Sequence, residues 1–426
     1  MATPLTTTSY AVGVRAWPSP HVPVVPGEPI ALRLHDVARD VVAPVEQSDP
    51  ARLYVCGVTP YDTTHMGHAA TYVTFDLVGR AMRDGGRAVT YVQNVTDVDD
   101  PLFERAERDG IDWRDLGRDQ IALFLEDMTA LGVIAPDRFM GVMESMDVII
   151  GAVTGLVDRG VTYEVVEDGV RDTYLDLTAA GGLGELSHLD RETMLAFSAE
   201  RGGDPQRPGK RDPLDPMLWR GEREGEPAWD AGALGRGRPG WHIECTAIAM
   251  EHLGDHVDVQ GGGTDLVFPH HEMSVVQAEA ITGQRPFARH TAHQAMVAYD
   301  GEKMSKSKGN LVRVSTLRRE GVDPMAIRLV LLDHHYRGEW EWTDEALETG
   351  IARLERWRSA MSTNGGPDAE ATIAALRAAV ADDLDTPTAL AAVDAWCEQS
   401  LSTGGDTLSA PGDMARALDA LLGVRL

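Results

Sequence analysis

A lysine-rich stretch, GEKMSKSKGN at residues 301–310, is the first part of the chain whose residue types suggest chemistry. It contains Lys303, Lys306 and Lys308, whereas the rest of the chain has a single lysine, Lys210, so 35 of the 39 basic residues are arginine. In a chain that uses arginine almost everywhere, lysine is expected where a compact, mobile ammonium contacts phosphate. A solvated charged loop is the alternative, and a second motif is needed to choose.

The second motif is THMGH at residues 64–68, which lies between a predicted strand at 52–58 and a predicted helix. His65 and His68 flank a glycine, so both the rings and the backbone can approach an anion. Ligands of open α/β sheets bind at this carboxyl end of the strands, where helix N-termini attract phosphate. Histidines beside a turn are common, so HMGH gains meaning only together with the lysine stretch.

The three cysteines, Cys56, Cys245 and Cys397, are too few for a disulfide framework. Cys56 ends the first strand, Cys245 lies in GWHIEC, and His270 lies in DLVFPHHE. Each follows or closes a predicted element of one sheet, so the three could converge at its carboxyl edge. Two thiolates and an imidazole suit zinc and leave a fourth position open. Cys397, by contrast, is interpreted as a small apolar core residue.

The predicted elements that must position these residues form an α/β fold. A strand at 52–58, a helix over 69–82 and a strand at 88–95 predict a βαβ unit with parallel strands and a right-handed crossover. We expect a leader with edge strands at 1–50, two halves of a Rossmann-type catalytic domain at 51–115 and 241–315, an inserted connective region at 116–240, and a C-terminal helical bundle at 316–426.

The composition of the 426 residues narrows the function classes. Hydrophobic content of 43% and charged content of 25% are ordinary for a globular protein, and no apolar run approaches the roughly 20 residues of a membrane span. The N-terminus lacks the features of a secretory signal, which predicts a cytoplasmic protein without membrane contact. A net charge of −28 argues against an extended nucleic-acid surface, so small-molecule substrates are expected.

HMGH and KMSKS together resemble the HIGH and KMSKS signatures of class I aminoacyl-tRNA synthetases. The resemblance implies the Rossmann-type fold of that class and ATP, with Mg²⁺, as a substrate. It also implies that His65, His68, Lys303 and Lys306 stabilise the phosphates as a carboxylate attacks the α-phosphate. Lys308 is interpreted as a solvated neighbour.

Four segments resemble cysteinyl-tRNA synthetases in order: YVCGVTPYD, YVQNVTDVDD, GWHIECTAIAM and GGGTDLVFPHHE. This resemblance implies one zinc ion per chain, held by Cys56, Cys245 and His270, which separates cysteine from serine because a soft metal prefers a thiolate to a hydroxyl. It also implies a substrate and ATP site lined by Cys56, Gly57, Val58, Thr59, Thr71, Asn94, Val95, Thr96, Trp241, Gly263, Thr264, Asp265 and Val297.

The sequence departs from the synthetase pattern at two places. Ser274 stands where the HHExE motif has its last glutamate, a further weak zinc ligand, so a three-ligand site is expected. Only 119 residues follow Ser307, and residues 311–426 hold 11 arginines against 19 acidic residues, a net charge of −8. We therefore expect no anticodon-binding region and no tRNA acceptor.

The whole pattern is similar to the cysteine ligases of mycothiol biosynthesis, through PYDTTHMGHAATYVTFDLV, FSAERGGDPQRPGK and the terminal LDALLGV. That family implies L-cysteine, ATP and glucosaminyl-inositol as substrates, and we expect a monomer. The alternatives are a truncated cysteinyl-tRNA synthetase and a non-catalytic cysteine-binding module. Pyrophosphate exchange would separate the module from an enzyme, and the choice of acceptor would separate ligase from synthetase.

Overall fold

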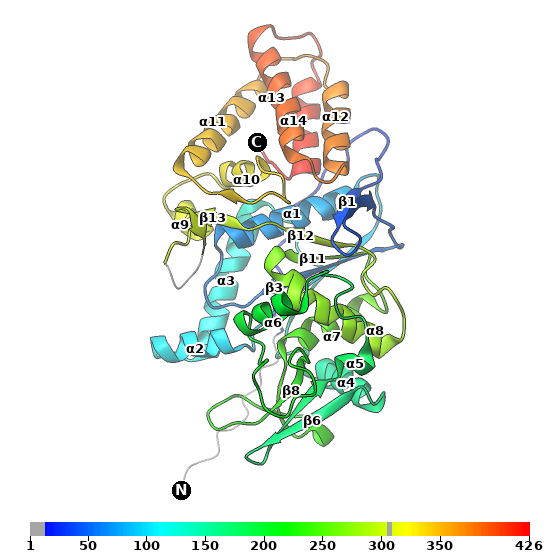
Figure 1. Ribbon diagram of the computed structural model, residues 1–426. Coiled ribbons are helices and arrows are strands. Elements are labelled where there is room, and N and C mark those ends of the chain that lie inside the picture. The colour runs from blue at the N-terminus through cyan, green and yellow to red at the C-terminus, as the bar shows by residue number, and fades with distance from the viewer. Residues whose placement is uncertain (1–12, 305–308) are drawn as a thin grey trace.

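The computed structural model describes residues 13–304 and 309–426, and its centre is a parallel five-stranded sheet (Figure 1). The strand order is β12-β11-β3-β4-β5, and every neighbouring pair is parallel. The strands are β3 (Ala51–Val58), β4 (Val89–Val95), β5 (Arg138–Gly141), β11 (Val259–Gly263) and β12 (Thr291–Gln294). The α/β fold with a parallel sheet, expected from the sequence, is confirmed.

Alternating residues of β3 determine which helix covers each face of the sheet. Leu53 and Val55 are buried in the same core cluster as α1 (Met66–Arg83), the crossover helix between β3 and β4. Tyr54 and Cys56 point to the opposite face and pack with α7 (Trp241–Leu253). Because side chains alternate along a strand, this register puts Cys56 on the α7 side. α8 (Glu272–Thr282) packs beside α7.

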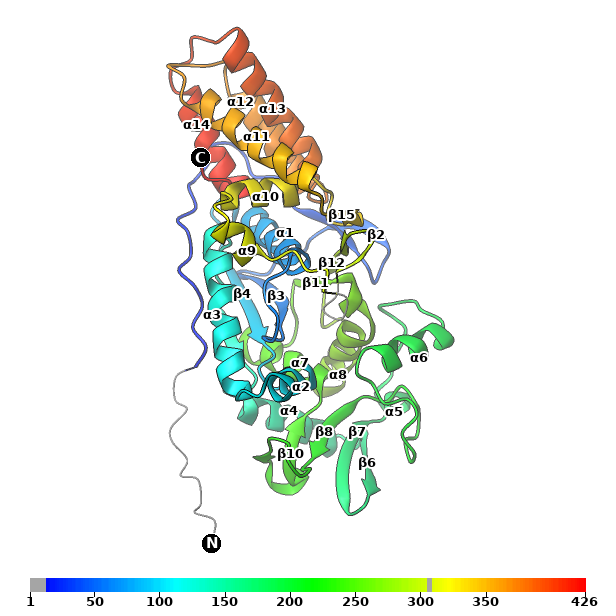
Figure 2. The ribbon, with the colours of Figure 1, turned by 90° about the vertical axis from the view of Figure 1, so that its left-hand side faces the viewer.

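The insertion contains a separate antiparallel sheet of order β6-β7-β8-β10-β9 (Figure 2). Of its helices, α4 leads from β5 of the catalytic sheet to this sheet, α5 and α6 lie between β7 and β8, and η1 lies between β9 and β10. The bounds are α4 (Met146–Asp158), β6 (Thr162–Glu167), β7 (Val170–Leu175), α5 (Leu177–Ala180), α6 (Arg191–Glu200), β8 (Met217–Gly221), β9 (Trp229–Asp230), η1 (Gly232–Leu234) and β10 (Arg236–Pro239).

One strand of the catalytic sheet comes from within residues 116–240. β5 pairs with β4 and follows α3 (Trp113–Leu131), which itself follows α2 (Asp100–Asp109). The chain therefore completes a second crossover, from β4 to β5, before it enters the separate antiparallel sheet. β5 pairs with the backbone groups on the outer side of β4.

The C-terminal part is helical, as the sequence predicts. α9 (Val314–Arg319) and α10 (Pro324–Leu332) lie against α3 and α1, and the bundle extends away from the sheet (Figures 1 and 2). A small sheet of order β14-β13-β15 joins two strands that precede α9 to one strand, β15, between α10 and α11. The remaining bounds are β13 (Val297–Tyr299), β14 (Glu302–Lys303), β15 (Trp340–Glu341), α11 (Asp344–Met361), α12 (Glu370–Ala381), α13 (Thr386–Ser402), α14 (Ala410–Ala417) and η4 (Leu418–Leu422).

A buried ion network joins α1 to this C-terminal part. Asp76, Arg80 and Arg328 are at most 3% exposed, and both guanidiniums contact the Asp76 carboxylate. Arg80 Nη1 donates to the carbonyl oxygen of Asp419 at 2.6 Å, and Arg328 Nε donates to that of Leu422 at 2.7 Å. The helix that begins at HMGH is therefore fixed at its other end by η4.

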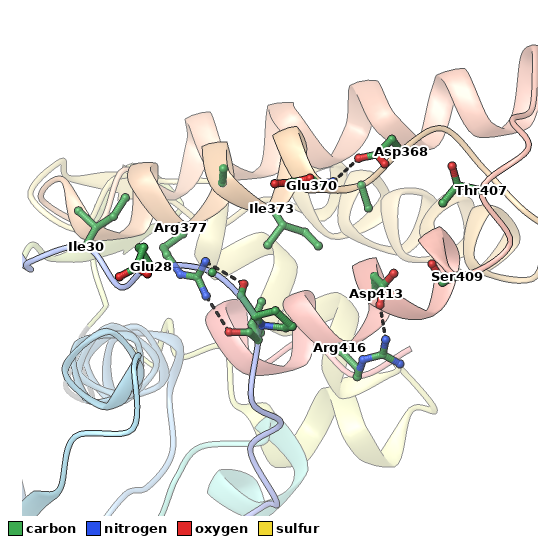
Figure 3. Close-up of a pocket in the computed structure, with 15 residues that line it drawn as sticks. Glu28, Ile30, Asp368, Glu370, Ile373, Arg377, Thr407, Ser409, Asp413 and Arg416 are labelled. Carbon is green, nitrogen blue, oxygen red and sulfur yellow. Dashed lines mark hydrogen bonds and ion pairs between the residues drawn. The ribbon is translucent and has the colours of Figure 1, made fainter.

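The N-terminal residues follow an extended path that ends at the bundle (Figure 2). The Trp17 indole N–H donates to the Val133 carbonyl at 2.8 Å, and Arg377 Nη2 donates to the Val25 carbonyl at 3.1 Å. Beyond this segment, β1 (Arg33–Asp36) and β2 (Val41–Pro44) pair with each other. A cavity of about 580 Å³ lies between residues 25–30, α12 and α14 (Figure 3).

Candidate active site and metal-binding group

Two cysteines and one histidine converge on the α7 face of the sheet. Cys56 comes from β3, Cys245 from α7, and His270 from the helical turn η3 (Val267–His271) that precedes α8. Their possible ligand atoms all lie within 4.8 Å of one another, and all three residues are buried. The structure thus brings together the three residues that the sequence singled out. Ser274 uses its hydroxyl to donate to the His270 carbonyl at 2.8 Å.

The chemistry of this group fits a soft divalent cation. Burial raises the pKa of the Cys56 thiol, whereas its hydrogen bond to Cys245 and the nearby His270 lower the pKa of the Cys245 thiol. The two thiols are therefore shifted in opposite directions by their surroundings. A cation with tetrahedral preference would stabilise both sulfurs as thiolates, and the imidazole would complete a three-residue ligand set.

Three further histidines surround this group, and sequence reasoning missed them. His242 Nδ1 lies 3.0 Å from His270 Nδ1, and His271 Nε2 lies 3.1 Å from Cys56 Sγ. His293, on β12, lies 2.7 Å from the other ring nitrogen of His271. Burial lowers the pKa of His242, His271 and His293, the last to about 3, so these rings are neutral hydrogen-bonding groups. The available signal was that His242 lies within WHIEC and His271 within PHHE, whereas His293, 22 residues after His271, had no such signal.

The HMGH segment lies at the N-terminus of α1. His65 is the N-cap residue, and its Nδ1 accepts from the Gly67 N–H at 3.1 Å. The His65 and His68 rings stack with centroids 3.7 Å apart. The two imidazoles therefore form one platform at a helix N-terminus and at the carboxyl end of β3, the position that suits a phosphate.

The segment after the lysine stretch is attached directly to HMGH. The Met66 N–H donates to the Val312 carbonyl at 3.0 Å, and the Val314 N–H donates to the Thr64 carbonyl at 3.1 Å. Arg313 Nη2 donates to the Asp62 carboxylate at 2.6 Å. Lys303 lies in β14, which pairs with β13, whereas Lys306 and Lys308 lie outside the described residues. Residues 312–314, just after the lysine stretch, are thus neighbours of HMGH in space.

The Asn94 side chain joins the carboxyl ends of β3 and β4 by hydrogen bonds. Its Oδ1 accepts from the Gly57 N–H at 2.8 Å, and its Nδ2 donates to Thr96 Oγ1 at 3.1 Å. A Cβ at Gly57 would lie 1.6 Å from the Asn94 carbonyl oxygen, so only glycine permits this approach. Thr59 follows β3 and donates to Asp99 at 3.0 Å. Val58 and Val95 end the two strands and pair with each other.

The remaining predicted residues fall into four places. Trp241 is the first residue of α7, and its ring centroid lies 4.3 Å from that of His270. Thr71, on α1, donates to the Gly67 carbonyl at 3.1 Å. Gly263 ends β11, and Thr264 and Asp265 follow in η2 (Thr264–Leu266), at the same sheet edge. Val297 lies farther along, in the small sheet.

Comparison with known proteins gives a consistent assignment. The model of the tRNA synthetases class I (C) catalytic domain matches residues 42–352. A protein of Streptomyces coelicolor, L-cysteine:1D-myo-inositol 2-amino-2-deoxy-alpha-D-glucopyranoside ligase, is 58% identical over 97% of this chain and 100% of its own length. The protein of that name from Gordonia bronchialis is 58% identical over 96% of this chain and 99% of its length. The chain belongs to this ligase family.

Solved structures agree at the level of the fold. Methionyl-tRNA synthetase of Mycobacterium tuberculosis, in complex with methionyl-adenylate, superposes with a TM-score of 0.58 over 88% of both chains at 16% identity. The ternary LeuRS–tRNA–LeuAMS complex of Agrobacterium radiobacter K84 gives a TM-score of 0.59 at 13% identity. The superposition covers 88% of the present chain and 83% of the LeuRS chain. The class I synthetase fold expected from HMGH and KMSKS is confirmed.

Proposed function

We propose that this protein is an AMP-forming ligase that joins L-cysteine to the amine of 1-O-(2-amino-2-deoxy-α-D-glucopyranosyl)-1D-myo-inositol, in mycothiol biosynthesis. The observation that carries the proposal is the 58% identity over essentially the whole length of relatives with that name. Cysteine and ATP first form cysteinyl-AMP and pyrophosphate. The amine then takes the cysteinyl group, giving an amide and AMP.

Cysteine selection is assigned to the group of Cys56, Cys245 and His270, which would hold one zinc ion. A bound zinc ion would supply a soft Lewis acid that prefers the thiolate of cysteine to the hydroxyl of serine. His242 would help to orient the His270 ring through the 3.0 Å contact between their Nδ1 atoms. Trp241 packs on that ring and is proposed to form a wall of the cysteine pocket.

ATP activation is assigned to the edge of the sheet at HMGH, beside the residues that follow the lysine stretch. His65 and His68 would bind the phosphates at the N-terminus of α1, and Lys303 and Lys306 would neutralise the triphosphate with its Mg²⁺. The ribose would lie at Gly263, Thr264 and Asp265, and the adenine at Val297. The cysteine carboxylate would lie between these groups and the metal-binding residues. Thr59, Thr71, Asn94 and Thr96 surround that space.

The transfer step needs little from the protein beyond positioning. The acceptor nitrogen forms a bond to the cysteinyl carbonyl carbon, the bond from that carbon to the phosphate oxygen breaks, and the nitrogen loses a proton to solvent. Because an acyl-adenylate is already activated, an unprotonated amine can attack it without a strong base. A small sugar needs only a pocket, whereas tRNA would need a basic surface, and residues 311–426 carry a net charge of −8.

A monomeric, cytoplasmic enzyme that does not use tRNA is part of the same proposal. Within residues 13–304 and 309–426, no helix combines the length and apolar character that crossing a membrane requires. ATP and cysteine as substrates agree with a cytoplasmic location.

The test is a choice of acceptor. The enzyme is incubated with ATP and labelled cysteine, together with either glucosaminyl-inositol or tRNA(Cys). We expect labelled cysteinyl-glucosaminyl-inositol and AMP in the first reaction, and no charged tRNA in the second. Charging of tRNA(Cys) without any labelled sugar product would favour a truncated synthetase. Absence of cysteine-dependent ATP–pyrophosphate exchange would favour the non-catalytic module.

A further inference from the structure

The ERGGDP segment, Glu200–Pro205, is a sequence motif to which the proposed function gives no role. α6 ends at Glu200, and the Arg201 side chain extends from the end of this helix to the turn that carries Asp265 and His270. Arg201 Nη1 donates to the Asp265 carbonyl oxygen at 2.7 Å and to the Phe268 carbonyl oxygen at 2.6 Å. One guanidinium from the insertion therefore bonds the backbone of the proposed ribose-binding turn at two points.

The two glycines of the motif set the direction of this arginine. Gly202 has φ of +83°, and the Gly203 N–H donates to the Ser198 carbonyl at 2.8 Å. A Cβ at Gly203 would lie 2.2 Å from Ser198 Oγ, so the chain can fold back on α6 only with glycine there. The Arg201 guanidinium also lies over the Phe197 ring, 4.2 Å from its centroid. The side chain is thus held before any ligand is present.

The aspartate of the motif anchors the segment to the insertion's own sheet. Asp204 Oδ1 accepts from Lys210 Nζ at 2.7 Å, and its other oxygen accepts from the Tyr174 hydroxyl of β7. Lys210 Nζ also donates to the Pro213 carbonyl at 2.7 Å, and its side chain is 3% exposed. Lys210 is the one lysine of the sequence outside residues 301–310. Its compact ammonium donates to the oxygens of Asp204 and Pro213 from an almost fully buried position.

A second contact fixes the other end of the same turn. Glu272, 1% exposed at the start of α8, accepts from the Gly184 N–H and the Ser187 N–H, both at 2.7 Å. Residues 265–272 therefore bond to the insertion through Arg201 on one side and through Glu272 on the other. Charge-assisted hydrogen bonds of this kind are short and strong, and they hold backbone geometry tightly.

We propose that Arg201 is a positioning residue that aligns the Asp265 turn with the ribose of ATP. The inference rests on the proposed function, because it takes that turn as the ribose site. Without the guanidinium, the carbonyls of Asp265 and Phe268 lose their donor, and the turn relaxes away from the ribose hydroxyls. A displacement of about 1 Å can cost about 10²-fold in rate, so the effect is measurable although Arg201 touches no reacting atom.

The experiment compares Arg201→Met with Arg191→Met in cysteine-dependent ATP–pyrophosphate exchange. Arg191 begins the same helix and pairs with Asp212 at 2.8 Å, with its side chain 54% exposed, so it makes a matched control. Each variant is assayed with ATP, 2′-deoxy-ATP and 3′-deoxy-ATP. We expect Arg201→Met to raise KM for ATP about 10–100-fold. One of the two deoxy analogues lacks the hydroxyl that Asp265 would bind, and the KM for that analogue should change little. The KM for cysteine should also change little.

The loss of ribose discrimination is what a purely structural role would not produce. Equal losses with ATP and both deoxy analogues, or discrimination identical to that of Arg191→Met, would overturn the inference. Arg201→Lys keeps a donor on a shorter side chain and should retain part of the discrimination. If circular dichroism shows that Arg201→Met does not fold, the discrimination measured with Arg201→Lys replaces it in the comparison. If the wild-type chain shows no exchange at all, the proposed function fails, and calorimetric titration with the three nucleotides still tests the role of Arg201.

Discussion

Replacing Asp76 by asparagine should destabilise the protein far more than a surface charge change does. The Asp76 carboxylate contacts both Arg80 and Arg328, and all three side chains are at most 1% exposed. The asparagine Oδ1 can still accept from the Ile134 N–H, now bonded to Asp76 at 2.8 Å. The amide nitrogen then replaces Oδ2, the atom that contacts both guanidiniums, so the substitution removes the charge together with the acceptor that Arg80 and Arg328 share.

The expected loss follows from that arrangement. Removing one partner of a buried ion pair costs about 3–5 kcal/mol, and here one anion serves two cations, so we expect a loss near 5 kcal/mol. The matched control is Asp382→Asn. Asp382 pairs with Arg33 at 2.9 Å, but the two side chains are 64% and 48% exposed. Exposed pairs of this kind contribute about 0–1 kcal/mol.

The assay is equilibrium urea unfolding, followed by the fluorescence of tryptophans such as Trp357, which is buried in α11. Burial opposes ionisation of Asp76, but Arg80 and Arg328 outweigh it and lower the pKa of the carboxyl below its usual value. Its stabilisation is therefore present above the unfolded-state pKa, about 3.9, and is lost as pH falls through the lower folded-state value. The difference between wild type and Asp76→Asn should shrink accordingly in acid.

A double-mutant cycle with Arg328→Met completes the test. Because the two side chains touch, the double variant should be more stable than the sum of the single losses predicts, by about 0.5–3 kcal/mol. The reasoning is refuted if Asp76→Asn unfolds at the same urea concentration as Asp382→Asn. Strict additivity in the cycle would refute the claimed coupling even if both single variants are unstable.

Three further predictions concern the site and its surroundings. Cys245→Ser should lose metal, measured by atomic emission, together with cysteine activation, and full activity of a demonstrably zinc-free preparation would contradict the metal assignment. Lys306→Ala should slow ATP–pyrophosphate exchange about 10²–10³-fold and leave cysteine binding nearly unchanged; an unaltered exchange rate would remove the lysine from the mechanism. Burial raises the pKa of Asp97 to about 6, so the folded state holds this proton more tightly, and stability should fall as pH rises from about 4 to about 6. Asp97→Asn should flatten that slope in urea titrations across the same range, and an unchanged slope would show that Asp97 does not cause it.

The sequence predicted best where a local pattern and a position on the sheet coincide. The apolar run of β3 and the helical spacing of α1 are strong local patterns, and both elements lie where we expected them. The convergence of Cys56, Cys245 and His270 followed because each belongs to an element that ends at or covers one edge of a parallel sheet.

The sequence predicted less well the features that depend on contacts between residues far apart in the chain. β5 has four residues, RFMG, and no apolar run, so its pairing with β4 depends on tertiary structure that the sequence does not reveal. Nothing in the sequence distinguishes Arg80 or Arg328 from the many exposed arginines, because burial of a charge depends on partners far along the chain. Arg201 is similar: ERGGDP is conspicuous as a motif, but its acceptors lie 64 and 67 residues later.

The carbonyls that satisfy Arg80 have a consequence for synthesis on the ribosome. Arg80 Nη1 donates to the carbonyl oxygen of Asp419, 339 residues farther along the chain. Arg328 likewise donates to the carbonyl oxygen of Leu422, which is made later still. While the intervening chain is being translated, the core beneath α1 holds a guanidinium without its final acceptors, so the first βαβ unit cannot reach its native packing in N-to-C order. Domains usually fold as they emerge, and partly packed intermediates expose apolar surface. Nascent chains stalled before η4 should therefore remain sensitive to protease and bind chaperones, even though every residue of the catalytic sheet has already been made.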